Sequence, residues 1–315
     1  MRRGHARVMT LRRRIPNDLP PMFRVREGLD RGMSRNRLDA ADLARPFHGI
    51  RMPSSPIAFE SRCHALATVL RPEDVLAGPT AVRLWGMPLP RLLEDSPLLH
   101  VSTLLPTRAL RRQGVVGTGR RSSASTMLRG LPVLEVWETC RSLAPMMSAI
   151  ELTCVIDFVV TGDSRRPSLS ELAALESYLA AHEHHPGIVR LRRAFAQARA
   201  GSWSPRETRL RLLVMAAGVP EPQLNVRLPL PDGRGIVPDL AWPSYRVAAE
   251  YNGAHHNKAG QRIHDLRRID DYTDIGWTTV NIEKTELLQH PDSVVFRVAQ
   301  RLASRGWRPP RGLLR

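Results

Sequence analysis

Asp239 and Glu250 are the residues of this chain whose types and spacing best suit chemistry, and both lie in the stretch VPDLAWPSYRVAAEYNGAHH, residues 237–256. Asp239 begins one short apolar strand, and Glu250 comes near the end of the next. Small and β-branched neighbours favour a buried sheet, so the two carboxylates are carried into an apolar neighbourhood. Burying a carboxylate is costly unless a cation or hydrogen bonds compensate its charge, and a divalent metal is a common compensator. The pattern predicts a metal site.

A third acid, Glu207, has two readings that the sequence leaves open. Ser204, Pro205 and Glu207 form an N-cap, a first helical position and a third position, which is a capping-box pattern. Glu207 therefore either caps its helix or reaches toward the metal, because this helix precedes the strands that carry Asp239 and Glu250. His256 is a candidate general base, since imidazole titrates near neutral pH, and Lys258 is a further candidate cation.

The elements that must position these residues begin at Ser204. Hydrophobic spacing predicts a helix ending at Gly218, strands over 224–228, 235–242 and 245–251, a helix over 261–275, a strand over 277–282 and a helix over 292–304. The helix over 261–275 carries Arg268 on its polar side. This order predicts a central mixed sheet with helices packed on it.

Upstream, we expect two further structured regions after a disordered basic arm at residues 1–21. In residues 22–58, helical spacing ends at Gly32, Ser34 is an N-cap candidate for a second short helix, and residues 47–51 read as a strand. Such an order is typical of a small winged helix-turn-helix, in which Arg35, Asn36 and Arg37 begin the recognition helix. A small helical hairpin without DNA-binding function is the alternative.

Residues 59–165 read as a small α+β middle domain, with helices near 63–70, 78–86, 135–143 and 149–159 and strands near 98–102 and 130–134. Residues 166–203 read as a helical connector. The domain that begins at Ser204 extends to residue 308. The fold class is therefore α/β, as an α+β multidomain chain of 315 residues.

The charge balance points to a polyanionic partner. The formal net charge is +17, and this favours nucleic acid, although an arginine-rich surface without such a role is the alternative. Aromatic residues are 5% of the chain, so RNA recognition by base stacking is disfavoured relative to DNA. Three isolated cysteines without CxxC spacing fit a reducing cytoplasm. No run of 18 apolar residues occurs, so we expect no membrane span.

Three strings of the C-terminal region, PDLAW, AAEYNGAHH and HDLRRIDDYTDIGW, resemble the PD-(D/E)XK nuclease superfamily, and specifically its branch related to very-short-patch-repair endonucleases. The segment MFRVREGLDRGMSRNRLDAADLARPFHGIRM is similar to the winged helix of AbiEi-like antitoxins, and GPTAVRLWGMPLP resembles the segment that follows it. The resemblance spans nearly the whole chain from residue 22, but its specific motifs lie in the last hundred residues.

The resemblance implies a restriction-endonuclease-like core that hydrolyses DNA phosphodiester bonds with Mg²⁺ or Mn²⁺. It assigns Asp239 and Glu250 as metal-binding acids, Glu207 as the upstream glutamate and His256 as the histidine after the turn, with Asp265 and Arg268 on the following helix. The superfamily pattern has lysine two residues after the second acid, and this chain has Asn252 there. Catalytic residues are thus Glu207, Asp239, Glu250, Asn252 and His256, and DNA-binding residues are Arg35, Asn36, Arg37, Lys258 and Arg268.

Two functions follow as hypotheses. The first is a metal-dependent DNA endonuclease targeted by its N-terminal module. The second is a catalytically inactive, AbiEi-like transcriptional regulator or antitoxin, which Asn252 favours. The expected partner is DNA, with a second copy of the chain and a cognate toxin as open alternatives.

Overall fold

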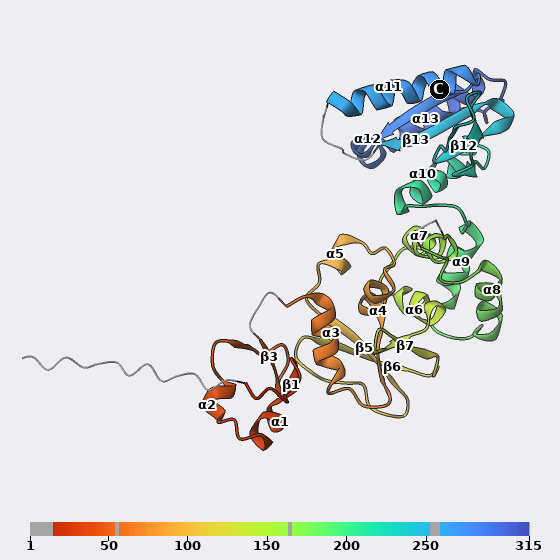
Figure 1. Cartoon of the computed structure of the whole chain (residues 1–315). Coiled ribbons are helices and arrows are strands. Elements are labelled where there is room, and N and C mark those ends of the chain that lie inside the picture. The colour runs from red at the N-terminus through yellow and green to blue at the C-terminus, as the bar shows by residue number, and fades with distance from the viewer. Residues whose placement is uncertain (1–14, 54–56, 163–165, 253–258, 315) are drawn as a thin grey trace, which may run out of the picture. The chain divides into compact units, whose positions relative to one another are not determined.

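The computed structural model describes residues 15–53, 57–162, 166–252 and 259–314, with the backbone alone over 259–266 (Figure 1). The chain mixes helices and sheets, as the sequence predicts for its class, and divides into two compact units. The N-terminal unit comprises Met1–Leu84 and Leu92–Glu135, and the C-terminal unit comprises Trp85–Arg91 and Val136–Arg315. Of the basic arm expected at residues 1–21, residues 1–14 lie outside the described residues. No helix in the described parts is both long and apolar enough to cross a membrane.

The N-terminal unit begins with a three-stranded antiparallel sheet in the order β1-β3-β2. Its elements are β1 (Phe23–Arg24), α1 (Val25–Asp30), α2 (Arg35–Leu38), β2 (Leu43–Ala44) and β3 (Ile50–Pro53). Ser34 caps α2 as expected, because its hydroxyl accepts a hydrogen bond from the Arg37 N–H at 3.2 Å. The strand predicted over 47–51 starts at Ile50, after Gly49 at a φ of +79°. Phe23 and Leu38 anchor the core between these elements.

The rest of the N-terminal unit is built on a five-stranded sheet in the order β6-β5-β4-β8-β7. Its strands are β4 (Asp74–Leu76), β5 (Leu99–Leu104), β6 (Val115–Arg120), β7 (Ser125–Leu128) and β8 (Leu131–Leu134). The same stretch of chain contains α3 (Phe59–Ala67), α4 (Gly78–Trp85) and α5 (Arg91–Glu94). The sequence analysis predicts β5 and β8 but not β4, β6 or β7. Two of the three have a plain reason: β4 is very short, and β6 contains two glycines. Gly86, at a φ of +72°, ends α4 as predicted.

The C-terminal unit starts with four helices: α6 (Val136–Leu143), α7 (Ala149–Val160), α8 (Leu172–Ala181) and α9 (Ile188–Gln197). The sequence analysis groups the first two with the middle domain and the last two with a connector. In the structure, α7 packs against both α9 and α10 (Pro205–Ala216). All four helices therefore belong to one compact unit with the C-terminal sheet.

That sheet has four strands in the order β14-β13-β12-β9. The strands are β9 (Gln223–Leu224), β12 (Leu240–Trp242), β13 (Val247–Asn252) and β14 (Thr278–Glu283). Neighbours are antiparallel except β13 and β14, which run parallel and are joined by α11 (Ala259–Asp274). A separate hairpin, β10 (Leu228–Pro229) with β11 (Gly235–Ile236), interrupts the chain between β9 and β12.

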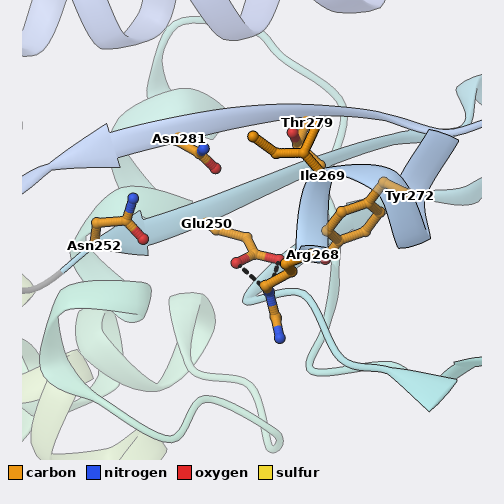
Figure 2. A pocket seen from close by; sticks show the side chains of 7 residues that line it. All are labelled: Glu250, Asn252, Arg268, Ile269, Tyr272, Thr279 and Asn281. Atoms are coloured by element: carbon orange, nitrogen blue, oxygen red, sulfur yellow. Dashed lines mark hydrogen bonds and ion pairs between the residues drawn. The ribbon is translucent and has the colours of Figure 1, made fainter. Parts of the chain in front are cut away.

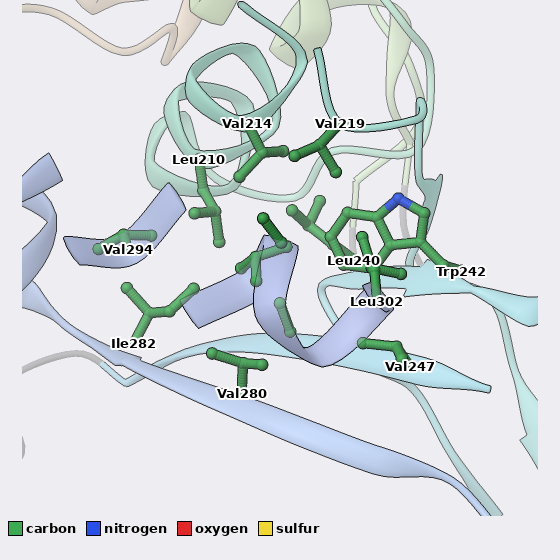
Figure 3. Close-up of a cluster of buried hydrophobic side chains, with 13 residues drawn as sticks. Leu210, Val214, Val219, Leu240, Trp242, Val247, Val280, Ile282, Val294 and Leu302 are labelled. Atoms are coloured by element: carbon green, nitrogen blue, oxygen red, sulfur yellow. The ribbon is translucent and has the colours of Figure 1, made fainter. Parts of the chain in front are cut away.

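Two apolar clusters occupy the two faces of the sheet. On one face, α10 and α13 (Pro291–Ala303) pack Leu210, Val214 and Leu302 against β12, β13 and β14 (Figure 3). On the other face, Tyr272 of α11 packs against Ala248 and the β10–β11 hairpin. Alternate residues of β13 therefore point to opposite faces, with Val247 and Ala249 toward the α10–α13 side.

Several boundaries differ from those predicted. The strand expected over 224–228 is divided into β9 and β10, because Asn225 adopts a left-handed conformation with a φ of +47°. The turn after β12 is the 3-10 helix η1 (Pro243–Tyr245), and a short helix α12 (Lys284–Gln289) follows β14 without having been predicted.

Candidate functional site

The register of β12 and β13 brings the two predicted acids together. Leu240 pairs with Ala249 in the antiparallel ladder, so the preceding Asp239 lies opposite Glu250. Directly opposed residues on neighbouring strands have Cβ atoms about 4.5–5.5 Å apart and share a sheet face. Glu250 alternates with Ala249, which places it on the α11 side of the sheet with Ala248. The predicted juxtaposition of the two carboxylates therefore follows from this register.

Arg268 and Tyr272, both on α11, hold the carboxylate of Glu250. The Arg268 Nε–H is 2.8 Å from Glu250 Oε1 and 2.7 Å from Oε2, and Tyr272 donates its hydroxyl proton to Oε1 (Figure 2). Arg268 is itself fixed by a second hydrogen bond, from Nη2 to the Val237 carbonyl at 2.8 Å. Burial and the neighbouring Glu250 raise the pKa of Tyr272, which keeps the hydroxyl protonated as a donor. Glu250 is thus oriented rigidly.

A small pocket opens beside this ion pair. Its lining residues come from β13, α11 and β14, and they are Glu250, Asn252, Arg268, Ile269, Tyr272, Thr279 and Asn281 (Figure 2). Asn252, which occupies the position of the superfamily lysine, lies at the end of β13 on the same face as Glu250. The pocket therefore offers amide and hydroxyl groups next to a carboxylate.

The pKa of Asp239 is strongly raised by its surroundings. Burial raises the pKa of Asp239 to about 7, and the negative charges of Glu207 and Glu250 act in the same direction. A hydrogen bond from the Tyr251 N–H, 2.7 Å from Oδ2, and the charge of Arg268 oppose the increase. The charges of Glu207 on α10 and Glu250 on β13 therefore both act on Asp239, which lies just before β12.

Ser204 is the N-cap of α10 as predicted, but Glu207 does not close a capping box, because its carboxylate bonds the residue before Ser204. The Glu207 N–H donates to the Ser204 hydroxyl at 3.2 Å, and its Oε2 accepts hydrogen bonds from the Trp203 N–H at 2.8 Å and from Asn225 Nδ2 at 2.7 Å. Its side chain is buried, and its charge contributes to the raised pKa of Asp239. Glu207 therefore stabilises the start of α10 and acts electrostatically on Asp239, whereas its contact with a metal stays a prediction. Asn225 is a partner that the sequence analysis missed.

The remaining predicted residues of this site cannot be placed in the same way. His256 and Lys258 lie outside the described residues, and for Asp265 only the helical backbone of α11 is described. Within the described part of the chain, no group of three or more His, Cys, Asp or Glu side chains is arranged to hold a metal ion.

A cation still fits the acids that are described. A carboxylate has about four lone-pair positions, so the contacts of Glu250 with Arg268 and Tyr272 leave it able to accept one more ligand bond. Asp239 lies opposite it and is hard to ionise, which is the condition that a bound cation would relieve. Asp239 and Glu250 would supply two hard oxygen ligands, and water would complete the shell of Mg²⁺.

The three residues of α2 that were predicted to contact DNA divide into two kinds. Arg35 and Asn36 are exposed at the start of α2. The guanidinium of Arg37 instead forms a two-pronged ion pair with Asp42, at 2.9 Å and 2.8 Å, and only 9% of its side chain is exposed. Arg37 therefore has a structural partner within the same small sheet region, a pairing that the sequence analysis did not include.

Comparison with known proteins finds relatives but no function. The chain is 26% identical over 275 residues to the proteins MT2308 and Rv2248 of two Mycobacterium tuberculosis strains, both described as uncharacterized. The alignment covers 86% of this chain and 97% of each relative, so the likeness extends across both units. No family model matches the chain, and no solved structure matches it.

Proposed function

We propose that the C-terminal unit is a metal-dependent endonuclease core that hydrolyses DNA phosphodiester bonds at Asp239 and Glu250, and that the N-terminal unit binds DNA. The position of Asp239 opposite the carboxylate of Glu250 carries this proposal, and the raised pKa of Asp239, to which Glu207 also contributes, supports it. Such an arrangement is costly for a purely structural purpose and favours a cation. The arrangement of α10, an antiparallel β9-β12-β13 sheet, α11 and a parallel β14 supports it, as does the net charge of +17.

The chain's own residues would prepare the substrate in defined ways. Arg268 and Tyr272 fix the direction of the Glu250 carboxylate, so its free lone pair is presented at a constant position. Asn252, on the same face, has an amide that can donate a hydrogen bond to a phosphate oxygen. When bound, a divalent cation neutralises charge on the phosphate and lowers the pKa of a coordinated water.

A second candidate is a DNA-binding regulator with an inactive nuclease fold. Both oxygens of Glu250 contact the guanidinium of Arg268, and Asn252 provides no positive charge where the superfamily has lysine. An ion pair that fully satisfied Glu250 would leave the sheet as a scaffold. The two candidates differ in one measurable respect, which is cleavage of DNA.

A plasmid-relaxation assay with Mg²⁺ or Mn²⁺ distinguishes them. We expect the wild type to nick or linearise supercoiled DNA and Glu250→Gln, which keeps the shape of the side chain, to be slower by on the order of 10²–10⁴. Glu176→Gln is the matched control, because Glu176 is exposed on α8 and its loss changes the net charge equally. We expect this control to cleave at the wild-type rate.

Three outcomes decide between the candidates. Cleavage by the wild type and the control but not by Glu250→Gln supports the nuclease. Gel-shift binding by all three proteins without cleavage supports the regulator and overturns the catalytic assignment. Absence of both cleavage and binding at low ionic strength overturns both candidates.

A further inference from the structure

A second cavity of the C-terminal unit lies on the opposite side of β13 from Glu250. Its volume is about 400 Å³, which is in the range of small-molecule sites. Tyr251 of β13 forms part of the cavity wall. Because Tyr251 alternates with Glu250 along the strand, its side chain points to the α10–α13 side of the sheet. This cavity is therefore separate from the pocket beside Glu250, and a ligand could bind there whether or not the protein is a nuclease.

Most of the cavity wall is apolar. The side chains come from α10 and α12, chiefly Leu212, Leu213, Ala216, Leu287 and Leu288. Leu288 is 66% exposed, although it belongs to a contiguous apolar surface. Ile150, at 46%, is a second exposed apolar residue of this wall, and apolar side chains that line one concave site mark a surface that binds something apolar.

The charged residues of the wall all have the same sign. Arg206, Arg209 and Lys284 line the cavity, and no Asp or Glu is among the described residues of its lining. The Arg206 guanidinium lies 5.2 Å from the centroid of the Tyr251 ring, and the Arg209 guanidinium is 3.8 Å from the Glu151 carboxylate. Arg206 and Arg209 are three residues apart on α10, so they lie on the same helix face as Leu213. Because Arg209 is paired with Glu151, Arg206 and Lys284 are the cations that select for a ligand that is both anionic and apolar.

We propose that this cavity binds a small amphipathic anion, with one carboxylate, sulfonate or phosphate group held by Arg206 and Lys284 and an aliphatic or aromatic body against the leucines of α10 and α12. A nucleic acid is the less suitable occupant, because its backbone presents repeated phosphates and gains little from a leucine-lined wall. The cavity would thus be a ligand site on the reverse of the candidate catalytic sheet.

A fluorescence titration with two probes tests both halves of the proposal. The first probe is 8-anilinonaphthalene-1-sulfonate, and the second is N-phenyl-1-naphthylamine, which has the same apolar body without the sulfonate. We expect the full-length wild type to bind one equivalent of the sulfonate. Lys284→Gln should weaken the sulfonate about tenfold, the loss expected for one charge-assisted hydrogen bond, and change binding of the neutral probe less than about twofold.

Two further variants complete the test, one as a charge-matched control and one as a probe of the apolar wall. Arg192→Gln removes an equal charge from an exposed position on α9 outside the cavity and should leave the Kd for both probes unchanged. Leu288→Gln alters an exposed wall residue, so it should preserve the fold, checked by the thermal midpoint, and weaken both probes.

Four results would overturn the proposal. The first is an equal loss in Lys284→Gln and Arg192→Gln, and the second is an equal response of the charged and neutral probes to Lys284→Gln. The third is binding of several equivalents of sulfonate. The fourth is displacement of the sulfonate by a short DNA duplex at matched ionic strength, which would assign the cavity to a nucleic-acid surface.

Discussion

Asp157 of α7 and Asp239 before β12 are both largely buried carboxylates of the C-terminal unit, and the chain compensates their charges differently. Asp157 Oδ2 accepts hydrogen bonds from Arg211 Nη2 and the Thr208 hydroxyl, each at 2.8 Å, and Oδ1 accepts one from the Arg199 N–H at 2.7 Å. At Asp239, the described residues supply a hydrogen bond from the Tyr251 N–H, while two other carboxylates lie close by.

This difference separates a structural acid from one available to a ligand. Burial raises the pKa of Asp157, but the charge of Arg211 and the three hydrogen bonds all oppose that increase. At Asp239, two negative charges add to the effect of burial. At Asp157 the fold itself compensates the charge. At Asp239 the Tyr251 N–H and the charge of Arg268 oppose the increase only in part, and a bound cation is the further compensation that we propose.

The same substitution at the two acids should have opposite effects, and the larger is at Asp157. Asp157→Asn leaves the fully buried Arg211 without a counter-charge, so we expect the free energy of unfolding to fall by about 3–5 kcal/mol. Urea unfolding at pH 7 measures this change. The double variant Asp157→Leu with Arg211→Met should lose less, because it removes both charges. If the free energy of unfolding of Asp157→Asn fell by less than about 1 kcal/mol, Asp157 would not be a structural acid and the contrast with Asp239 would be wrong.

Asp239→Asn should instead stabilise the cation-free protein at alkaline pH. The pKa of Asp239 rises from 3.8 to about 7 on folding, so the folded state binds the proton more tightly. The contribution of Asp239 to stability is therefore greatest below about pH 4 and is lost as pH rises through 7. We expect a gain of on the order of 2–4 kcal/mol for Asp239→Asn at pH 8 with EDTA, shrinking toward pH 4.

Adding Mg²⁺ sharpens this test. A cation that binds the folded wild type at ten times its Kd should add about 1.4 kcal/mol to the free energy of unfolding. In Asp239→Asn, Mg²⁺ should increase the free energy of unfolding much less, because one of the two carboxylates proposed to bind the cation is now an uncharged amide. Equal stabilisation of both proteins by Mg²⁺ would remove Asp239 from the site.

The smallest expected effects extend the comparison to cations of the N-terminal unit. Arg35 is exposed and Arg37 is paired with Asp42, so Arg35→Ala should weaken duplex DNA binding several-fold and lower the salt dependence by about one charge. Arg37→Ala should mainly reduce stability, by about 1 kcal/mol. Fluorescence anisotropy over a series of salt concentrations and thermal unfolding measure the two effects. If Arg37→Ala weakened DNA binding more than Arg35→Ala did and left stability unchanged, Arg37 would be the DNA-binding residue and its pairing with Asp42 would not be structural.

The sequence predicted helix caps and helix ends correctly, because these features depend on a few neighbouring residues. Ser34 and Ser204 cap their helices, and Gly86 ends α4, because capping and left-handed glycine involve only a few neighbouring residues. The division of the predicted strand at Asn225 was missed, since its conformation is tied to hydrogen bonds with Gly201 and Glu207 far along the chain.

The sequence by itself determined the positive charge, the mixed helix and strand composition, and the positions of Asp239 just before one short strand and of Glu250 on the next. Only the tertiary structure decided that Arg268 and Tyr272 clamp Glu250, and that Glu207 interacts with Asp239. The reason is that residue type and spacing are local properties, whereas burial and the choice of charge partner depend on α10, α11 and the sheet meeting in space. The ionisation of Asp239 is therefore a property of the fold.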